Sequence, residues 1–240
     1  MTTIFKRDFC GYFQTPIGYA FIGVFLTLSG ILFYLYNIQN LSGDLLTFLS
    51  QLTSLTMLLC PLLTMPLLCE PRQKRTDRLL MTVPVSLTNI VLGKYLAAAC
   101  VMLLTILLTN GYTLIILLFG KLYIGEWFVG YLGFTLQSLS FIAADLFVTC
   151  FAKSQITGAI SAFAVNFVLW MADLLAARIP FEWLGTAMKA VSLYDHYTAF
   201  LVGQLSPSDC LFYVSFIFCA LLLSVRVLDQ RRFSEGGSIS

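Results

Sequence analysis

Residues 69–94, CEPRQKRTDRLLMTVPVSLTNIVLGK, lie between two long apolar runs, 45–69 and 95–120, that contain no charged side chain. The stretch carries five basic and two acidic residues: Glu70, Arg72, Lys74, Arg75, Asp77, Arg78 and Lys94. Charged groups are costly inside a bilayer, so the chain must leave the membrane here. Thr76 is a suitable cap for a short helix, and Pro84 would stop it. Such a helix between two membrane spans would offer a surface to a partner protein.

The composition predicts an all-α integral membrane protein. The 240 residues are 59% hydrophobic and 11% charged, with a mean hydropathy of +0.88. Soluble domains carry about 25% charged residues, so this chain cannot cover a water-exposed globular surface. Its apolar residues fall in blocks long enough to cross a bilayer, which takes about 20 helical residues. The seven cysteines form no CxxC motif and have no histidine partner nearby, which favours packing roles and no metal site.

These blocks predict six transmembrane helices with short links between most of them. The expected spans are roughly Ile17–Tyr36, Leu45–Leu68, Tyr95–Phe119, Trp127–Phe151, Gln155–Ala177 and Pro207–Arg226. Residues 17–233 then form one transmembrane domain, preceded by an interfacial segment, 1–16. The polar tail, 234–240, is expected to be disordered.

The distribution of basic residues predicts that both termini and the 69–94 stretch are cytoplasmic, because Lys and Arg are enriched in cytoplasmic loops. On this orientation the inner side holds eleven basic residues: Lys6, Arg7, Arg72, Lys74, Arg75, Arg78, Lys94, Lys153, Arg226, Arg231 and Arg232. The outer side holds three, namely Lys121, Arg178 and Lys189. We therefore expect a multi-pass protein of the cell membrane.

Two further segments have helical patterns outside the predicted spans. In the first, Phe5, Phe9 and Phe13 share one helical face, which predicts an amphipathic helix lying in the headgroup plane. In the second, the sequence from Ser192 to Asp195 is a capping-box pattern that predicts a helix over 193–202, ended by Gly203. A helix of that length covers about 15 Å, half of a bilayer, which favours an outer re-entrant or interfacial hairpin within 178–206.

The sequence contains no recognisable catalytic motif. Neither Gly-Lys pair fits a phosphate-binding loop, and there is no HExxH, GxSxG or paired-carboxylate motif. The single histidine, His196, adjoins Asp195, and the pair is interpreted as an interfacial histidine rather than a proton-transfer site. We expect no enzymatic activity, no cofactor in this chain and no nucleic-acid partner.

Polar groups inside the predicted spans are the other candidates for function. Asp145 lies too deep in the fourth span for its short side chain to reach the interface, so it is expected to face the helix bundle. It could serve as a structural hydrogen-bond acceptor, line a substrate route or transmit coupling. Asn166, like Asn110 and Gln137, is expected to pair across helices.

Three pieces of the sequence, in this order, resemble one known family. They are FQTPIGY at 13–19, PLLTM at 61–65, and TDRLLMTVPVS at 76–86 followed by Gly93-Lys94. Together they resemble the membrane subunit of type-2 ABC exporters, the permeases that include gliding-motility and nitrous-oxide-reductase-maturation types. Two positions depart from the family pattern: Pro71 follows Glu70, where a charged residue is common, and Arg75 replaces the usual glycine.

The resemblance implies a six-span permease that pairs with a second copy or a paralogue. Separate ABC ATPase subunits, which hold ATP and Mg, would dock on a coupling helix at 76–82 and move it. The docking residues implied are Glu70, Arg72, Lys74, Arg75, Thr76, Asp77, Arg78, Leu79 and Leu80. Residues 3–14, with Phe5, Phe9 and Phe13, resemble an elbow helix, and 178–206 resembles the outer re-entrant helices.

Other interpretations of the sequence remain open. The chain could be a secondary carrier or channel that needs no ATPase, or a membrane anchor or assembly subunit that transports nothing. The basic residues at 72–78 could also bind anionic lipids, although acidic residues are interleaved with them.

Overall fold

The computed structural model describes residues 2–73, 86–119, 123–176 and 188–236, which form helices and turns and contain no β-strand. The helices are α1 (Thr2–Gln14), α2 (Pro16–Phe33) with a π-helical extension η1 (Tyr34–Ile38), α3 (Leu45–Gln73), α5 (Leu87–Phe119), α6 (Ile124–Thr149), α7 (Gln155–Ala176), α9 (Leu193–Leu201) and α10 (Pro207–Gly236). The short helix predicted at 76–82 lies outside the described residues.

Six of these helices are long and apolar enough to cross a membrane, which confirms the six predicted spans. The third span differs most, because α5 begins at Leu87, eight residues before the predicted start at Tyr95. Ser86 directly precedes it. At the other end of the chain, α10 continues to Gly236 and so includes residues 234–236, which were expected to lie in the disordered tail.

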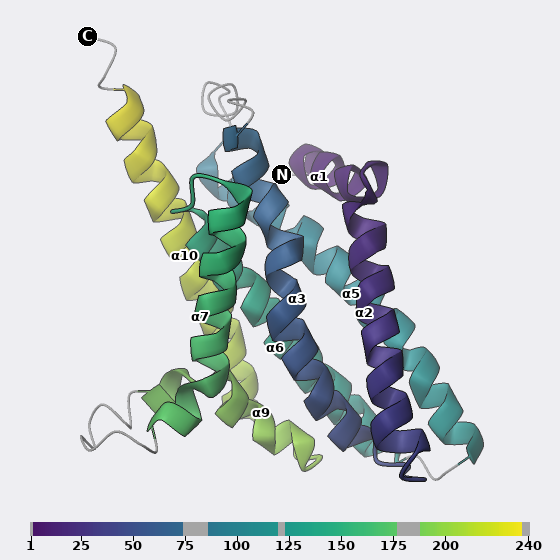
Figure 1. Ribbon diagram of the computed structural model, residues 1–240. Coiled ribbons are helices and arrows are strands. Elements are labelled where there is room, and N and C mark those ends of the chain that lie inside the picture. The colour runs from purple at the N-terminus through teal and green to yellow at the C-terminus, as the bar shows by residue number, and fades with distance from the viewer. Residues whose placement is uncertain (1, 74–85, 120–122, 177–187, 237–240) are drawn as a thin grey trace.

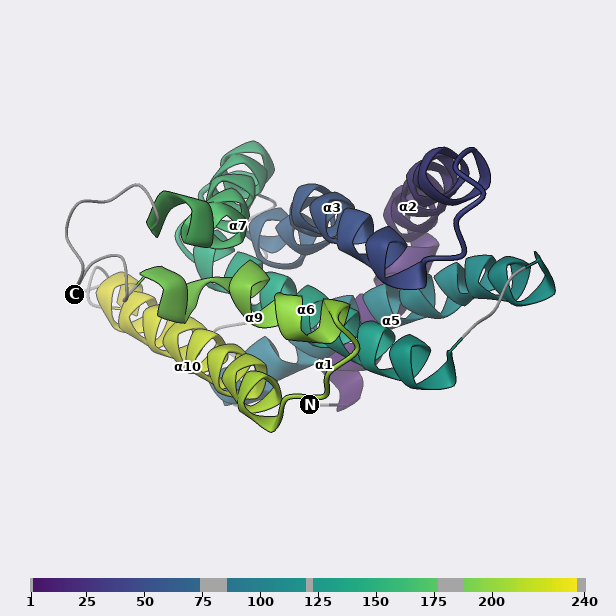
Figure 2. The same ribbon diagram turned by 90° about the horizontal axis from the view of Figure 1, so that it is seen from below.

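The spans form two layers of three helices (Figures 1 and 2). One layer holds α7, α3 and α2, and the other holds α10, α6 and α5. The most extensive contact joins the two middle helices, α3 and α6. We call the end of the bundle that carries α1 the α1 end and the opposite end, where α9 lies, the α9 end.

Local sequence explains where several helices begin. Pro16 occupies the first turn of α2, where its missing N–H costs nothing. Asp44 caps α3 by accepting hydrogen bonds at Oδ1 from the backbone N–H groups of Leu46 (3.0 Å) and Thr47 (3.2 Å). Ser154 and Thr157 exchange side-chain-to-backbone hydrogen bonds of 3.1 and 3.3 Å at the start of α7, which is capping-box geometry.

The short helix predicted over 193–202 is present as α9. The hydroxyl of Ser192 accepts a hydrogen bond of 3.2 Å from the backbone N–H of Asp195, as the capping box predicts. The helix ends beside Gly203, whose φ of +74° lies in the region that favours glycine. α9 packs against α6, α7 and α10 and buries Leu193, Tyr197 and Phe200, so it is part of the core.

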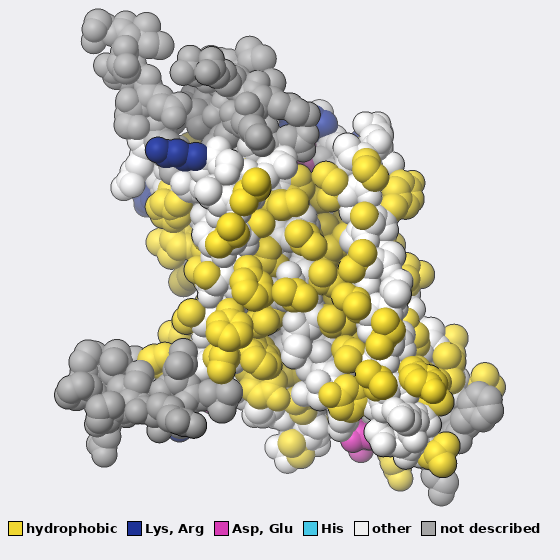
Figure 3. Space-filling model, viewed as in Figure 1, with side chains coloured by type: hydrophobic (Ala, Val, Ile, Leu, Met, Phe, Trp, Pro, Cys, Tyr) yellow, Lys and Arg dark blue, Asp and Glu magenta, His cyan; other side chains and the backbone are white. Residues whose placement is uncertain are grey.

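The six spans differ in how much of each helix is buried. α3, α5 and α6 bury most of their span residues, whereas α2, α7 and α10 bury about a quarter of theirs. The outward positions of α7 and α10 carry large apolar side chains, such as Ile156, Phe167, Leu211 and Phe218. Figure 3 shows hydrophobic side chains covering the middle of one face, with basic groups near the α1 end. Such a surface suits a lipid environment.

Candidate functional site

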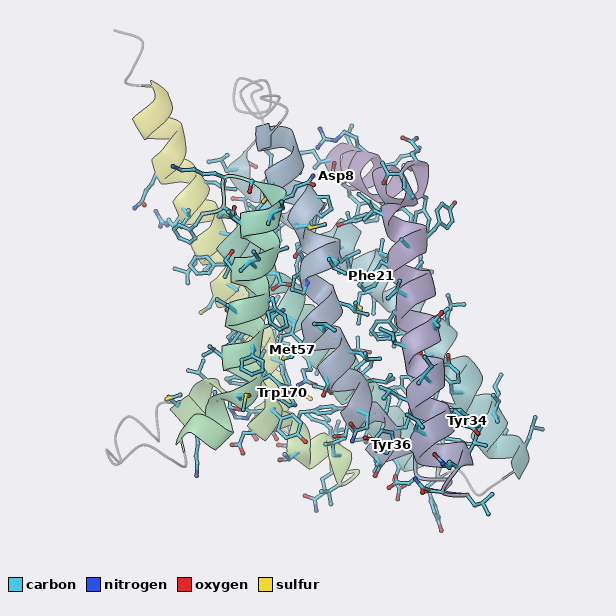
Figure 4. All side chains as sticks on the ribbon, in the orientation of Figure 1. Asp8, Phe21, Tyr34, Tyr36, Met57 and Trp170 are labelled. Atoms are coloured by element: carbon cyan, nitrogen blue, oxygen red, sulfur yellow. The ribbon has the colours of Figure 1, made fainter. Side chains whose placement is uncertain are left out.

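A polar joint at the α1 end connects three helices. Lys94, in the second turn of α5, is only 3% exposed. Its Nζ donates a hydrogen bond to Asp8 Oδ2 of α1 at 3.2 Å and another to the backbone carbonyl of Leu67 in α3. Figure 4 shows Asp8 at this end of the bundle. The ammonium group therefore joins α1, α3 and α5.

Close packing strengthens the same joint. The buried hydroxyl of Tyr12 donates a hydrogen bond of 2.5 Å to the carbonyl of Leu63, which joins α1 to α3 a second time. Burial, with the charge of Asp8 as a second cause, raises the pKa of Tyr12 well above its usual value, so this phenol is a donor at neutral pH. A Cβ atom on Gly93 would lie 3.0 Å from the side chain of Ile4, so α1 and α5 approach closely here.

The aromatic face predicted for the first helix is present on α1. The rings of Phe5 and Phe9 stack at 5.7 Å, and those of Phe9 and Phe13 meet edge to face at 5.2 Å. All three side chains are partly buried against the core. Arg7 and Lys6 are exposed, and Arg7 pairs with the Asp8 carboxylate at 2.8 Å. The amphipathic helix is therefore confirmed, whereas its place in a membrane remains a prediction.

The predicted ATPase-docking residues lie next to this joint in the sequence. Glu70 and Arg72 belong to the last turns of α3, where the structure describes the backbone and not their side chains. The remaining residues of that set lie outside the described residues: Lys74, Arg75, Thr76, Asp77, Arg78, Leu79 and Leu80. The two helices that lead into and out of this segment are the ones that Lys94 connects.

A second polar group lies within the bundle, at the contact of α3, α6 and α7. Asp145 of α6 is fully buried, and its Oδ2 accepts a hydrogen bond of 3.4 Å from the hydroxyl of Thr64. Asn166 of α7 is also fully buried; it lies beside the carboxylate and donates to the carbonyl of Met57 at 3.5 Å. The structure thus brings Asp145 and Asn166 together, which confirms that Asp145 faces the bundle.

The other predicted amides also pair across helices. Asn110 Oδ1 accepts a hydrogen bond of 3.0 Å from the indole of Trp127, which joins α5 to α6. Gln137 Oε1 accepts one of 3.1 Å from Thr53, which joins α6 to α3. Both bonds fit the expectation that buried amides link membrane helices.

Comparison with protein-family models and with curated proteins finds no match. The family resemblance inferred from the sequence therefore remains a proposal, and the site must be interpreted from its own geometry. Within the described residues, no three His, Cys, Asp or Glu side chains gather as a metal site would require.

The histidine pairs with a residue of another helix and not with its sequence neighbour Asp195. His196 Nδ1 lies 2.7 Å from Asp209 Oδ1 in the first turn of α10, and its ring stacks on Phe212 at 3.8 Å. Asp195 instead forms the first turn of α9, where its backbone N–H meets Ser192. Adjacent helical residues point in different directions, so neighbours in the sequence need not form a pair.

Lys94 is a functional candidate that the sequence did not single out. It was counted among the charges of the 69–94 stretch, and the structure shows it buried between helices. The Asp8–Lys94 pair is 86 residues apart in the chain. One sequence signal was available: Lys94 is an isolated charge among apolar residues, and a charge in such a setting needs a partner of opposite sign.

Proposed function

We propose that this chain is the membrane subunit of an ATP-driven exporter of the type-2 ABC class, which forms a substrate route as a dimer and is driven by separate ATPase subunits. The observation that carries the proposal is the polar joint at the α1 end. That joint links α1 to both helices flanking the basic segment 74–85. A partner that moves this segment would move three helices at once.

The position of the joint makes it suitable for transmitting such a movement. Leu67 lies six residues before the end of α3, and Lys94 lies seven residues after the start of α5. Each is therefore about two helical turns from the segment that a partner would contact. Buried, well-packed contacts transmit displacement better than exposed ones because they cannot deform without loss of packing.

In this proposal the basic residues of 70–80 dock the ATPase, and α1 acts as an elbow helix at the membrane surface. α9 and the segment before it close the outer end of the route. Both termini would lie in the cytoplasm, and ATP and Mg would be bound by the partner alone. Asp145 and Asn166 are the candidates for lining the route or coupling it to helix movement.

The proposal is tested by purifying the tagged chain from its native membranes in mild detergent and assaying vanadate-sensitive, Mg-dependent ATP hydrolysis. We expect an ATPase to copurify, and the combined changes Arg72→Glu, Lys74→Glu and Arg78→Glu to weaken that association several-fold. Lys189→Glu is the matched control, because this exposed basic residue lies beyond the spans on the opposite side. Retention of the ATPase by the triple variant, or the absence of any ATPase, would overturn the proposal.

The buried carboxyl group favours a second candidate, an ion-driven carrier that needs no ATPase. Ionisable residues inside transmembrane bundles often serve ion coupling, and Asp145 is such a residue. This candidate predicts transport that responds to an ion gradient, survives ATP depletion and is lost in Asp145→Asn. The ATPase assay above separates the two candidates.

A further inference from the structure

Six buried polar side-chain atoms have no hydrogen-bond partner among the described residues; one is Asn37 Oδ1 of η1, and the other five belong to α6, α7 and α9, which pack against α3. These five are Gln137 Nε2, Asp145 Oδ1, Asn166 Oδ1, Trp170 Nε1 and Tyr197 Oη. A buried polar group without a partner costs about 1–3 kcal/mol, and such groups are rare in folded proteins. Several of them along one contact therefore require a common explanation.

These atoms lie beside a polar stripe on one face of α3. Ser50, Thr53, Met57 and Thr64 follow at intervals of three, four and seven residues, which keeps them on one side of the helix. The stripe from Ser50 to Thr64 rises about 21 Å at 1.5 Å per residue, two-thirds of the hydrocarbon core. It therefore runs from the α9 end deep into the bundle.

Hydrogen bonds and ring contacts connect the stripe to the unpaired atoms at each level. At the α9 end, the hydroxyls of Ser50 and Tyr194 lie 3.5 Å apart, and Tyr194 contacts the ring of Trp170. In the middle, Thr53 bonds Gln137 and lies beside the hydroxyl of Tyr197.

Toward the α1 end, Asn166 bonds the carbonyl of Met57 and lies beside Asp145, which accepts from Thr64. Figure 4 shows Trp170 nearer the α9 end than Met57. These contacts lie at three successive levels of α3 and together form what we call the polar seam, between α3, α6, α7 and α9, with Asp145 at its end nearest α1.

We propose that a file of ordered water molecules occupies this seam and brings solvent from the α9 end of the bundle to the carboxyl group of Asp145. The proposal concerns the solvation of the bundle and does not depend on an ATPase partner.

The mixture of donors and acceptors selects water as the ligand. Two of the unpaired atoms are donors, Gln137 Nε2 and Trp170 Nε1, while Asp145 Oδ1 and Asn166 Oδ1 are oxygen acceptors in this arrangement. A metal cation would satisfy the oxygens alone, and an anion the N–H groups alone. Water donates and accepts, and a buried water usually makes about three hydrogen bonds to groups of this kind.

The chain contains its own controls for a test. Tyr197 and Tyr213 are both fully buried at α9, but only Tyr213 has a hydrogen bond, to the carbonyl of Leu193 at 2.6 Å. Trp170 and Trp127 are both half-buried, but the Trp127 indole is bonded to Asn110. The two residues of each pair match in type and burial, and only Tyr197 and Trp170 lie on the seam.

The experiment is hydroxyl-radical labelling of the purified full chain in lipid nanodiscs by short X-ray pulses, read by mass spectrometry. Radicals form from water in place, so side chains beside bound water are oxidised fastest. We expect Tyr197 to be oxidised several-fold faster than Tyr213, and Trp170 several-fold faster than Trp127. Equal rates within the tyrosine pair would overturn the proposal.

A variant adds a second criterion. Thr53→Val removes the hydroxyl between Gln137 and Tyr197 at nearly constant volume and should lower the Tyr197 rate several-fold. Thr105→Val is the control, because this buried threonine on α5 bonds only the carbonyl of Val101 in its own helix among the contacts described. A Tyr197 rate unchanged by Thr53→Val would contradict the proposal, and the wild-type comparison decides the matter even if the variant fails to fold.

Discussion

Lys94 shows how a single buried charge can organise one end of a membrane protein. Its ammonium group has left water, and the Asp8 carboxylate and the Leu67 carbonyl replace part of its hydration. Removing one partner of such a pair is more harmful than replacing both, because the remaining charge is left buried. The joint is therefore sensitive to single changes and tolerant of paired ones.

We predict that Asp8→Leu lowers the free energy of unfolding by about 3–5 kcal/mol, the range for breaking a buried ion pair. The double variant Asp8→Leu with Lys94→Met should recover most of this loss. Arg7→Gln, which changes a half-exposed pair, should cost under about 1 kcal/mol. Unfolding in detergent followed by tryptophan fluorescence measures all three, and similar losses in Asp8→Leu and Arg7→Gln would contradict the assignment.

Tyr12 gives the joint a pH dependence. Because burial raises the pKa of the folded phenol above its usual value of 10.0, the unfolded chain releases this proton at lower pH than the folded chain does. The contribution of Tyr12 to the free energy of unfolding is complete below pH 10 and is lost as the pH rises through the pKa of the folded state. Tyr12→Phe should lose about 1 kcal/mol at neutral pH, the contribution of one hydrogen bond.

The same variant should show a flatter decline of stability above pH 10 than the wild type. The exposed Tyr19, changed to Phe, is the control and should retain the wild-type slope. Chemical unfolding at several pH values measures the slopes, and parallel slopes for wild type and Tyr12→Phe would contradict this account.

Among the helices, α9 depends on its cap and on its contact with α6. Ser192→Ala removes the acceptor for the Asp195 N–H and should destabilise α9 by about 1 kcal/mol, whereas Ser192→Asp retains an acceptor and should cost less. Hydrogen exchange of residues 193–201 is the measurement. Equal exchange in the two variants would show that the cap does not stabilise α9.

The contact between α6 and α9 leaves no room for a side chain at Gly133. A Cβ atom there would lie 2.5 Å from Phe200 Cγ, so Gly133→Ala must displace α9 and should cost about 1–3 kcal/mol. Gly111→Ala on α5 is the matched control, because nothing lies within 4 Å of its Cβ position. The thermal unfolding midpoint of Gly133→Ala should lie below that of Gly111→Ala. The opposite order would refute the prediction.

At the scale of the whole molecule, the α1 end holds α1, the link between α6 and α7 and the C-terminal part of α10 (Figure 1), which carry Lys6, Arg7, Lys153 and Arg226. Lys189 precedes α9, the helix at the opposite end. The positive-inside rule then predicts that the α1 end faces the cytoplasm. Alkaline phosphatase fused after residue 236 should be inactive, and the same enzyme fused after residue 205 should be active. The opposite pattern would reverse the orientation and remove the proposed docking site from the reach of a cytoplasmic ATPase.

The sequence predicted the helices well because each depends on local properties. Span length, apolar composition and the Ser192 cap are all encoded within a few turns of chain. The partners of the polar residues were not predictable in the same way. Asn166 was expected to pair across helices, but its contact with Met57 in α3 depends on how α3 and α7 pack. The burial of Lys94 was not predicted for the same reason, because its partner Asp8 lies in a distant helix.

The length of α5 has a consequence for the surrounding lipid. Its 33 residues extend about 50 Å at 1.5 Å per residue, against a hydrocarbon core of about 30 Å. The helix can fit only by inclining or by projecting from the bilayer, and Figure 1 shows it slanting across the bundle. Acyl-chain length should therefore set the inclination of α5. The rate of ATP hydrolysis by the proposed exporter complex should then differ between vesicles of short-chain and long-chain phospholipids, even when the headgroups are the same.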